Sequence, residues 1–258
     1  MSDSHHDDGT QRVFHSEPHT SGIDTGRKRK PPKNLADGMV KALRPKQWVK
    51  NVLVLAAPAA AGADALFHSR VLLDVLLAFI VFCMGASSIY LINDARDVEA
   101  DRAHPTKRFR PIAAGVLPVG LAYAMAALLI VGSIGLSFLA TAGPQLAIVM
   151  AVYIALQLGY CFGWKHMPVI DIALVSSGFM LRTMAGGVAA GIVLSQWFLL
   201  VAAFGSLFMA SGKRYSEILL AERTGAKIRK SLEGYTPTYL RFVWTLAATA
   251  LVMSYSLW

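Results

Sequence analysis

The sequence predicts an all-α protein, a polytopic bundle of transmembrane helices. Of its 258 residues, 55% are hydrophobic and only 16% are charged, whereas soluble domains carry about 25% charged residues. The apolar residues gather in runs of about 20, the length that a helix needs to cross about 30 Å of hydrocarbon. The basic residues are also sorted between alternate loops. Together these observations favour a membrane protein over a soluble globular one.

Seven apolar runs are candidate spans. They cover residues 46–64, 71–93, 117–140, 144–162, 168–191, 194–212 and 237–258. The last run reaches Trp258 without a polar flank, so we expect more helices to follow in the natural protein. Residues 1–42 are polar, lack apolar periodicity and are expected to be a disordered cytoplasmic tail. The membrane domain is expected to cover 43–258.

The distribution of basic residues predicts the orientation. The segment up to Lys50 holds 10 Lys and Arg residues, the loop after the second run 5, the loop after the fourth run only Lys165, and the loop after the sixth run 6. Together they account for 22 of the 25 in the chain. Because cytoplasmic loops collect Lys and Arg, the N-terminus and these loops are expected in the cytoplasm. The net charge of +9 is then a sign of topology, and binding of nucleic acid is not expected.

The most polar stretch, LINDARDVEADRAHPTKRFRPIAAG at 91–115, lies at the end of the second run. Asn93, Asp97 and Asp101 are four residues apart, so a helix that continues out of the membrane places them on one face. Asp94 lies on the neighbouring face. Carboxylates on one stripe repel each other unless a cation lies between them, and oxygen ligands suit Mg²⁺. The stretch therefore predicts a Mg²⁺ site that also binds a diphosphate.

A solvated helix end is the alternative interpretation. The acids would then pair with Arg96 and Arg102 at the surface, in ion pairs that contribute about 0–1 kcal/mol. This alternative explains Glu99 well. It explains the acidic stripe poorly, because the stripe lies where the helix leaves the membrane.

Three segments resemble the UbiA superfamily of intramembrane transferases. NDARDVEAD at 93–101 matches the N-D-x-x-D-x-x-x-D motif of that superfamily, LRPKQWVKN at 43–51 resembles the segment before its first span, and DRAHPTKRFRPIAAG at 101–115 resembles the loop after the motif. The resemblance implies a transferase domain of nine helices around a central cavity, with Mg²⁺ held by the motif. It implies catalytic roles for Asp94, Asp97 and Asp101.

Prenyl-transferring members carry a second acidic motif, and this sequence departs from them there. The corresponding stretch at 160–187 has Asp171 without an acidic partner, and Lys165 and His166 stand nearby. With the segment at 213–244, it resembles the actinobacterial branch that transfers 5-phosphoribose from phosphoribosyl diphosphate (PRPP) to decaprenyl phosphate for cell-envelope arabinan synthesis. That branch implies the bacterial plasma membrane. A prenyltransferase with a prenyl diphosphate donor and a small or aromatic acceptor remains the alternative, and a homo-oligomer is left open.

Nine further residues are candidates for substrate contact, because they are polar or charged and lie at the cytoplasmic ends of spans, in cytoplasmic loops or inside a span. They are Lys46, Tyr90, Lys107, Arg108, Lys165, Asp171, Arg182, Lys213 and Arg214. Arg182 lies well inside a span, where a charge is costly and indicates function. Asp171 and Arg182 are eleven residues apart and share a helix face. They are expected either to line one wall of a cavity or to form a structural ion pair. For the other candidates, anchoring at the membrane interface, contact with lipid headgroups and helix capping remain open.

Overall fold

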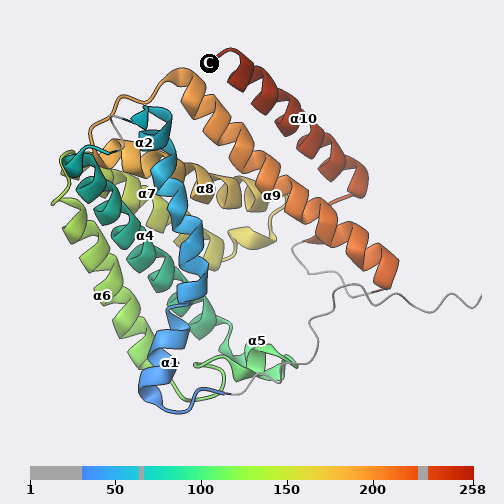
Figure 1. The fold of residues 1–258 in the computed structure, drawn as a ribbon. Coiled ribbons are helices and arrows are strands. Elements are labelled where there is room, and N and C mark those ends of the chain that lie inside the picture. The colour runs from blue at the N-terminus through green and yellow to red at the C-terminus, as the bar shows by residue number, and fades with distance from the viewer. Residues whose placement is uncertain (1–30, 64–66, 226–231) are drawn as a thin grey trace, which may run out of the picture. The chain divides into compact units, whose positions relative to one another are not determined.

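The computed structural model describes residues 31–63, 67–225 and 232–258, and every regular element in these ranges is helical (Figure 1). The α-helices are α1 (Leu35–Ala42), α2 (Ala56–Ala60), α4 (Ser69–Arg96), α5 (Val98–Ala103), α6 (Val119–Ser137), α7 (Gly143–Cys161), α8 (Ile170–Ala189), α9 (Gln196–Thr224) and α10 (Pro237–Ser256). Three further elements are 3-10 helices: η1 (Pro45–Leu55), η2 (Lys107–Phe109) and η3 (Trp164–His166). The predicted all-α class is confirmed.

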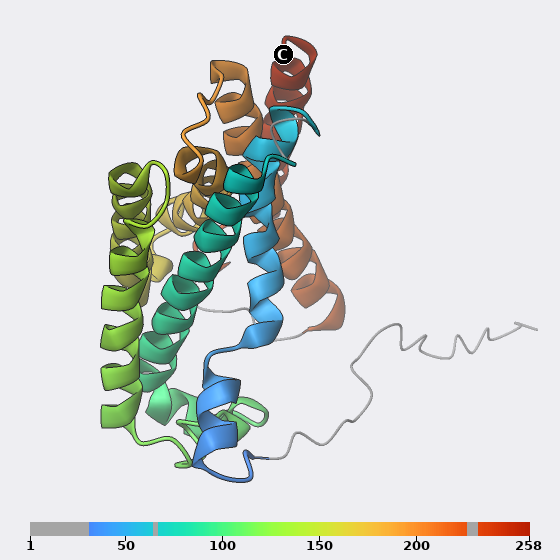
Figure 2. The same cartoon turned by 60° about the vertical axis from the view of Figure 1, so that its left-hand side comes forward.

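Four of the seven predicted spans coincide with helices that are long and apolar enough to cross a membrane: α4, α6, α7 and α8. The apolar window of α4 is 67% buried by the rest of the protein, whereas that of α6 is 17% buried. In Figures 1 and 2, α6 runs beside α4. The apolar side chains that α6 leaves exposed, such as Leu128 and Val131, are therefore suited to contact lipid.

The other three predicted spans differ from simple apolar helices. The run at 46–64 is divided between η1 and α2, and η1 begins with Pro45. Helices α9 and α10 begin close to the predicted starts, but they are not among the helices apolar enough to cross a membrane. Helix α9 continues to Thr224 with charged residues in its last turns, which the prediction of a span at 194–212 did not include.

Part of the segment predicted as a disordered tail is helical. The side chain of Asn34 caps α1 by accepting a hydrogen bond from the backbone N–H of Asp37. Gly38 and Ala42 are buried, and Ala42 packs with the buried residues of α4 and α6. The chain is therefore already helical before residue 43, while residues 1–30 lie outside the described residues.

Helix α8 lies in the middle of the bundle and packs against η1, α2, α4, α7 and α9. Its approach to η1 needs a glycine, because a Cβ atom at Gly186 would overlap the carbonyl group of Val54. Gly187 is close to Ala57 and Leu194 in the same way. Small residues thus bring the backbones together, and η1, α4 and α8 all contribute residues to the lining of one cavity.

Candidate active site

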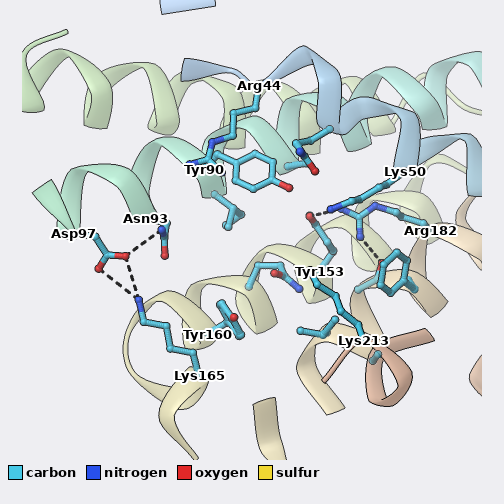
Figure 3. Close-up of a pocket in the computed structure, with 18 of the residues that line it drawn as sticks. Arg44, Lys50, Tyr90, Asn93, Asp97, Tyr153, Tyr160, Lys165, Arg182 and Lys213 are labelled. Carbon is cyan, nitrogen blue, oxygen red and sulfur yellow. Dashed lines mark hydrogen bonds and ion pairs between the residues drawn. The ribbon is translucent and has the colours of Figure 1, made fainter. Parts of the chain in front are cut away.

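A cavity of about 740 Å³ lies between α4, α7, α8, α9, η1 and the loops at 104–110 and 163–169 (Figure 3). Along α4 it is lined from Ala86 to Asn93, which is about 10 Å of helix at 1.5 Å per residue, and Asp97 lines it just beyond the end of α4. Along α8 it reaches from Val175 to Arg182. The cavity therefore extends from the polar end of α4 into the part of the bundle formed by apolar helices.

The lining of the cavity is strongly basic. In the described part of the chain, the Lys and Arg residues that line it are Arg44, Lys50, Lys107, Arg110, Lys165, Arg182, Lys213 and Arg214. Asp97 is the one Asp or Glu residue among the described lining residues. Since unlike charges attract over short distances in a partly desolvated site, the cavity is suited to bind a ligand with several negative charges.

The sequence predicted that Asn93, Asp97 and Asp101 lie on one helix face, and the structure shows that they do not. Helix α4 ends at Arg96, Asp97 leaves the helical conformation with φ −89° and ψ 12°, and α5 begins at Val98. This break turns Asp101 away from the continuation of α4. The spacing of four residues thus overestimated how many of the motif's oxygens face the cavity together.

Asp94 and Asp101 are buried and bound to arginines. Asp94 accepts hydrogen bonds from Arg44 at 2.6 and 2.7 Å and from Arg110 at 3.1 Å, and Asp101 accepts one from Arg110 at 2.6 Å. Lys107 lies 3.9 Å from Asp101. The two carboxylates therefore hold Arg44 and Arg110, which line the cavity, and Asp94 joins two segments that are far apart in sequence.

Asn93 and Asp97 form the cavity-facing part of the motif. The amide of Asn93 donates to Asp97 at 3.2 Å, and the ammonium group of Lys165 lies 3.3 Å from the same carboxylate (Figure 3). The Asp97 side chain is 36% exposed. Its carboxylate oxygens and the Asn93 carbonyl oxygen are donors that suit Mg²⁺, which usually takes one or two carboxylates and completes its shell with water and substrate phosphate.

The described residues contain no group of three or more His, Cys, Asp and Glu side chains placed to hold a metal ion. A cation at Asn93 and Asp97 would therefore depend on oxygens of a ligand. Such a site fits a metal–diphosphate complex better than a metal bound by protein alone.

Asp171 is fully buried and pairs with Arg214, not with Arg182. The guanidinium group of Arg214 donates to both Asp171 oxygens at 2.8 and 3.0 Å and lies 3.2 Å from Glu217. Burial by itself would lower the pKa of Arg214, but the hydrogen bond and the charge of Asp171 outweigh it, and the pKa is raised. Arg214 thus stays charged, and Asp171 presents it to the cavity.

Arg182 enters the cavity from α8 and is held by uncharged groups. It donates to the Asn51 side chain at 2.7 Å, to the Gly178 carbonyl at 2.5 Å and to the Tyr153 hydroxyl at 2.8 Å. Its guanidinium carbon also lies 4.8 Å from the centre of the Tyr153 ring. The open question of an Asp171–Arg182 pair is thereby answered: these residues have different partners.

The structure brings most of the predicted site residues to one cavity. Those that line it are Tyr90, Asn93, Asp97, Lys107, Lys165, Arg182, Lys213 and Arg214. Asp94, Asp101 and Asp171 lie behind this lining and hold its arginines. Lys46 and Arg108 are exposed and are not among the lining residues, so their roles in substrate binding stay predictions.

Sequence reasoning did not select several lining residues as sites. They are Arg44, Gln47, Lys50, His104, Arg110, Tyr153, Gln157, Tyr160 and His166. Gln157 and Tyr160 lie near the end of the apolar helix α7, where polar residues one turn apart were the available signal. Arg44 lies before the first predicted span and resembled an anchoring charge. Only its position beside Asp94 distinguishes it from other basic residues of that segment.

Comparison with known proteins places the chain in a family. The sequence pattern of the UbiA prenyltransferase family matches residues 51–258. A decaprenyl-phosphate phosphoribosyltransferase of Corynebacterium glutamicum is 81% identical over 254 residues, which are 98% of this chain and 76% of that protein. A protein of the same name from Mycolicibacterium smegmatis is 68% identical over 230 residues, 88% of this chain and 72% of that protein.

A solved structure has the same fold at much lower identity. It is the UbiA homologue of Archaeoglobus fulgidus bound to GPP and Mg²⁺, with a TM-score of 0.68 and 17% identity over 85% of this chain and 76% of that one. The four apolar helices, the acidic motif at the end of α4 and the match over residues 51–258 lead to one conclusion. The chain belongs to the UbiA prenyltransferase family and is a multi-pass membrane transferase.

Proposed function

We propose that the protein transfers 5-phosphoribose from PRPP to a long-chain polyprenyl phosphate, decaprenyl phosphate in particular, and releases diphosphate. The main observation behind this proposal is the charge of the cavity: its described lining contains eight Lys and Arg residues and one carboxylate. PRPP is rich in negative charge, with a diphosphate on one side of the ribose and a phosphate on the other. The names of the relatives at 81% and 68% identity support the same activity.

Asn93 and Asp97 are the residues proposed to hold Mg²⁺ with the diphosphate of PRPP. When bound there, the ion would neutralise part of the charge that the diphosphate carries as it leaves. Mg²⁺ is present in the solved structure of the Archaeoglobus fulgidus relative. Lys165 lies beside Asp97, with its ammonium group 3.3 Å from the carboxylate, and is proposed to bind a phosphate oxygen of the diphosphate held there.

The reaction needs little acid–base chemistry. An oxygen of the polyprenyl phosphate forms a bond to C1 of the ribose, and the bond from C1 to the diphosphate breaks, with its electron pair going to the diphosphate. The second pKa of a phosphate monoester is near 6, so the acceptor is already ionised at neutral pH. Catalysis then rests on positioning and on stabilising the departing charge.

Arg44 and Arg110 are proposed to contact the anionic substrates at the Asp97 end of the cavity. Both line the cavity, and both are fixed by Asp94. A fixed guanidinium binds a phosphate with less loss of side-chain freedom than a mobile lysine. Asp94 and Asp101 then serve the reaction by holding these cations, while Asp97 is the acid that faces the substrate.

We also propose that the protein lies in the bacterial plasma membrane with its N-terminus and cavity mouth on the cytoplasmic side, and that its product serves arabinan synthesis in the cell envelope. The concentration of Lys and Arg in the loops next to the acidic motif supports this orientation. Water-soluble PRPP would enter from the cytoplasm, and the lipid acceptor would enter from the membrane.

Transfer of a prenyl group from a prenyl diphosphate to a small acceptor is the second candidate function. The family description and the GPP in the related structure favour it. The Asp171–Arg214 pair opposes it, because Asp171 is fully buried and its two oxygens accept hydrogen bonds from an arginine. No second cavity-facing acid is thus present in the described lining to hold another metal ion.

The test is transfer by the purified chain in detergent. PRPP, Mg²⁺ and decaprenyl phosphate should yield a phosphoribosylated lipid, identified by mass spectrometry, together with diphosphate. Geranylgeranyl diphosphate in place of PRPP should yield no product with this acceptor or with an aromatic acceptor. Absence of the phosphoribosylated lipid, in a preparation shown to be folded by circular dichroism and thermal unfolding, would contradict the proposal.

A further inference from the structure

The cavity has a second cationic end, distinct from the end formed by Asn93, Asp97 and Lys165. Lys50, Arg182 and Lys213 line it, and we call these three residues the Arg182 cluster. Figure 3 shows them on the opposite side of the cavity from Asp97 and Lys165. All three line the same cavity, and each carries a positive charge.

The Arg182 cluster is poor in acidic partners. Arg182 is 8% exposed, and no carboxylate among the described residues forms an ion pair with it. Lys50 likewise has no ion-pair partner in the described part of the chain, and Lys213 has only Glu217 at 4.0 Å. Arg182 is the buried member of the cluster, while Lys50 and Lys213 are exposed, and a buried cation without an opposite charge is costly. A bound anion would remove that cost.

Arg182 also has hydrogen-bonding capacity left for a ligand. An arginine has five N–H donors, and three of those of Arg182 are used by Asn51, Gly178 and Tyr153. These three contacts fix the plane of the guanidinium group. The two remaining donors are thus held in place, which suits the oxygens of a phosphate.

Arg182 is also far from the Asp97 end. It lies 12 residues beyond Ile170, where α8 begins, which corresponds to about 18 Å along the helix. The loop with Lys165 precedes that same helix end. One metal-bound diphosphate is too compact to occupy both ends, so the Arg182 cluster requires another anionic group.

We propose that the Arg182 cluster is a binding site for a phosphate monoester, separate from the diphosphate site at Asn93 and Asp97. This inference rests on the proposed function, which supplies two such groups: the 5-phosphate of PRPP and the headgroup of the polyprenyl phosphate. Both carry close to two negative charges at neutral pH. The site makes the enzyme specific for a substrate set with two anionic groups, which a prenyl diphosphate and an uncharged acceptor do not provide.

Binding of two soluble probes in EDTA tests the site without metal or turnover. The probes are ribose 5-phosphate, for the donor, and farnesyl phosphate, for the lipid headgroup, each titrated calorimetrically into the full chain in detergent. Lys50→Gln is the main variant, because Lys50 is exposed and its side chain makes no described hydrogen bond whose loss would unfold the protein. Arg182→Lys is the second variant, and Arg241→Gln on α10 is the matched control for loss of one positive charge.

Lys50→Gln and Arg182→Lys should raise the Kd of at least one probe tenfold or more, while Arg241→Gln and Asp97→Asn change it by less than threefold. Loss for ribose 5-phosphate assigns the site to the donor, and loss for farnesyl phosphate assigns it to the acceptor. The proposal is overturned if neither probe binds the unmodified protein, if Lys50→Gln leaves both Kd values within threefold, or if Asp97→Asn weakens binding equally. Transfer of phosphoribose without such binding would leave the proposed function standing and remove only this site.

Discussion

Asp97 is the acid of the motif that lines the cavity, and the proposed chemistry depends on it most directly. It combines a carboxylate that is 36% exposed with contacts to Asn93 and Lys165. The other acids of the motif are 3–4% exposed and bound to arginines. The structure therefore separates two roles that the sequence motif presents as one: facing the ligand, and holding the cations around it.

The first prediction concerns Asp97→Asn. Loss of the one carboxylate in the described lining of the cavity should lower transfer about 100-fold or more, because the proposed Mg²⁺ site loses its anionic protein ligand. It should also weaken binding of Mn²⁺, measured by electron paramagnetic resonance in the presence of diphosphate. Glu99→Gln is the control, since Glu99 is exposed and contacts Arg102. Wild-type Mn²⁺ binding in Asp97→Asn would refute the assignment.

The second prediction concerns Asp94→Asn. Removing this charge leaves Arg44 and Arg110 without their shared partner, and breaking a fully buried ion pair costs about 3–5 kcal/mol. The cost here is expected to be smaller, because the two arginine side chains are about a quarter exposed. Asp94→Asn should therefore lower the midpoint of thermal unfolding and raise the KM for PRPP, but leave the concentration of Mg²⁺ needed for half-maximal rate unchanged.

A shift in the Mg²⁺ requirement of Asp94→Asn as large as that of Asp97→Asn would show that both carboxylates bind the metal. It would contradict the division of the motif. The same Glu99→Gln variant controls for the loss of one acid in this part of the chain.

At the scale of elements, the loop between α7 and α8 is held in place by the loop before α10. The N–H of Val169 donates to the hydroxyl of Tyr235 at 2.7 Å, and Val169 has φ +70°, a conformation that a β-branched residue rarely adopts. Tyr235 is buried, and burial raises the pKa of its hydroxyl. This contact holds the loop in which Lys165 lies, four residues before Val169, beside the cavity that Lys165 lines.

The third prediction follows from that contact. Tyr235→Phe removes the hydroxyl, so the strained Val169 conformation relaxes and Lys165 moves away from Asp97. Transfer should fall about tenfold, with a higher KM for PRPP. Val169→Gly added to Tyr235→Phe should restore part of the activity, because glycine adopts a positive φ without strain. Equal activity of Tyr235→Phe and the unmodified protein would contradict this positioning role.

The elements also show how far the sequence predicts this fold. Apolar length located α4, α6, α7 and α8 within a few residues, because helices that face lipid must be long and apolar. The break at Asp97 was not predicted. Asp94 and Asp101 lie on either side of it, and both accept hydrogen bonds from Arg110, a contact from outside the helix that residue spacing does not reveal. The cavity position of Arg44 was missed for the same reason: its partner Asp94 lies 50 residues away.

At the scale of the whole molecule, the loops rich in Lys and Arg and the acidic motif are predicted to lie on the same side of the membrane, the cytoplasmic side. The fourth prediction uses single cysteines in a background without Cys83 and Cys161. The bacterial cells are treated so that the outer envelope is permeable and the plasma membrane stays intact. A membrane-impermeant maleimide should then label Val193→Cys and not Glu99→Cys. Disruption of the plasma membrane should expose Glu99→Cys. Labelling of Glu99→Cys in intact cells would reverse the proposed orientation.

The identity of the donor tests the central claim most directly. PRPP and geranylgeranyl diphosphate, at equal concentration in one reaction with Mg²⁺, decaprenyl phosphate and an aromatic acceptor, compete for the same protein, and all lipid products are identified by mass spectrometry. We predict phosphoribosylated decaprenyl phosphate as the product, formed by the unmodified chain and lost in Asp97→Asn. A prenylated acceptor formed in its place would contradict the account and restore the second candidate function.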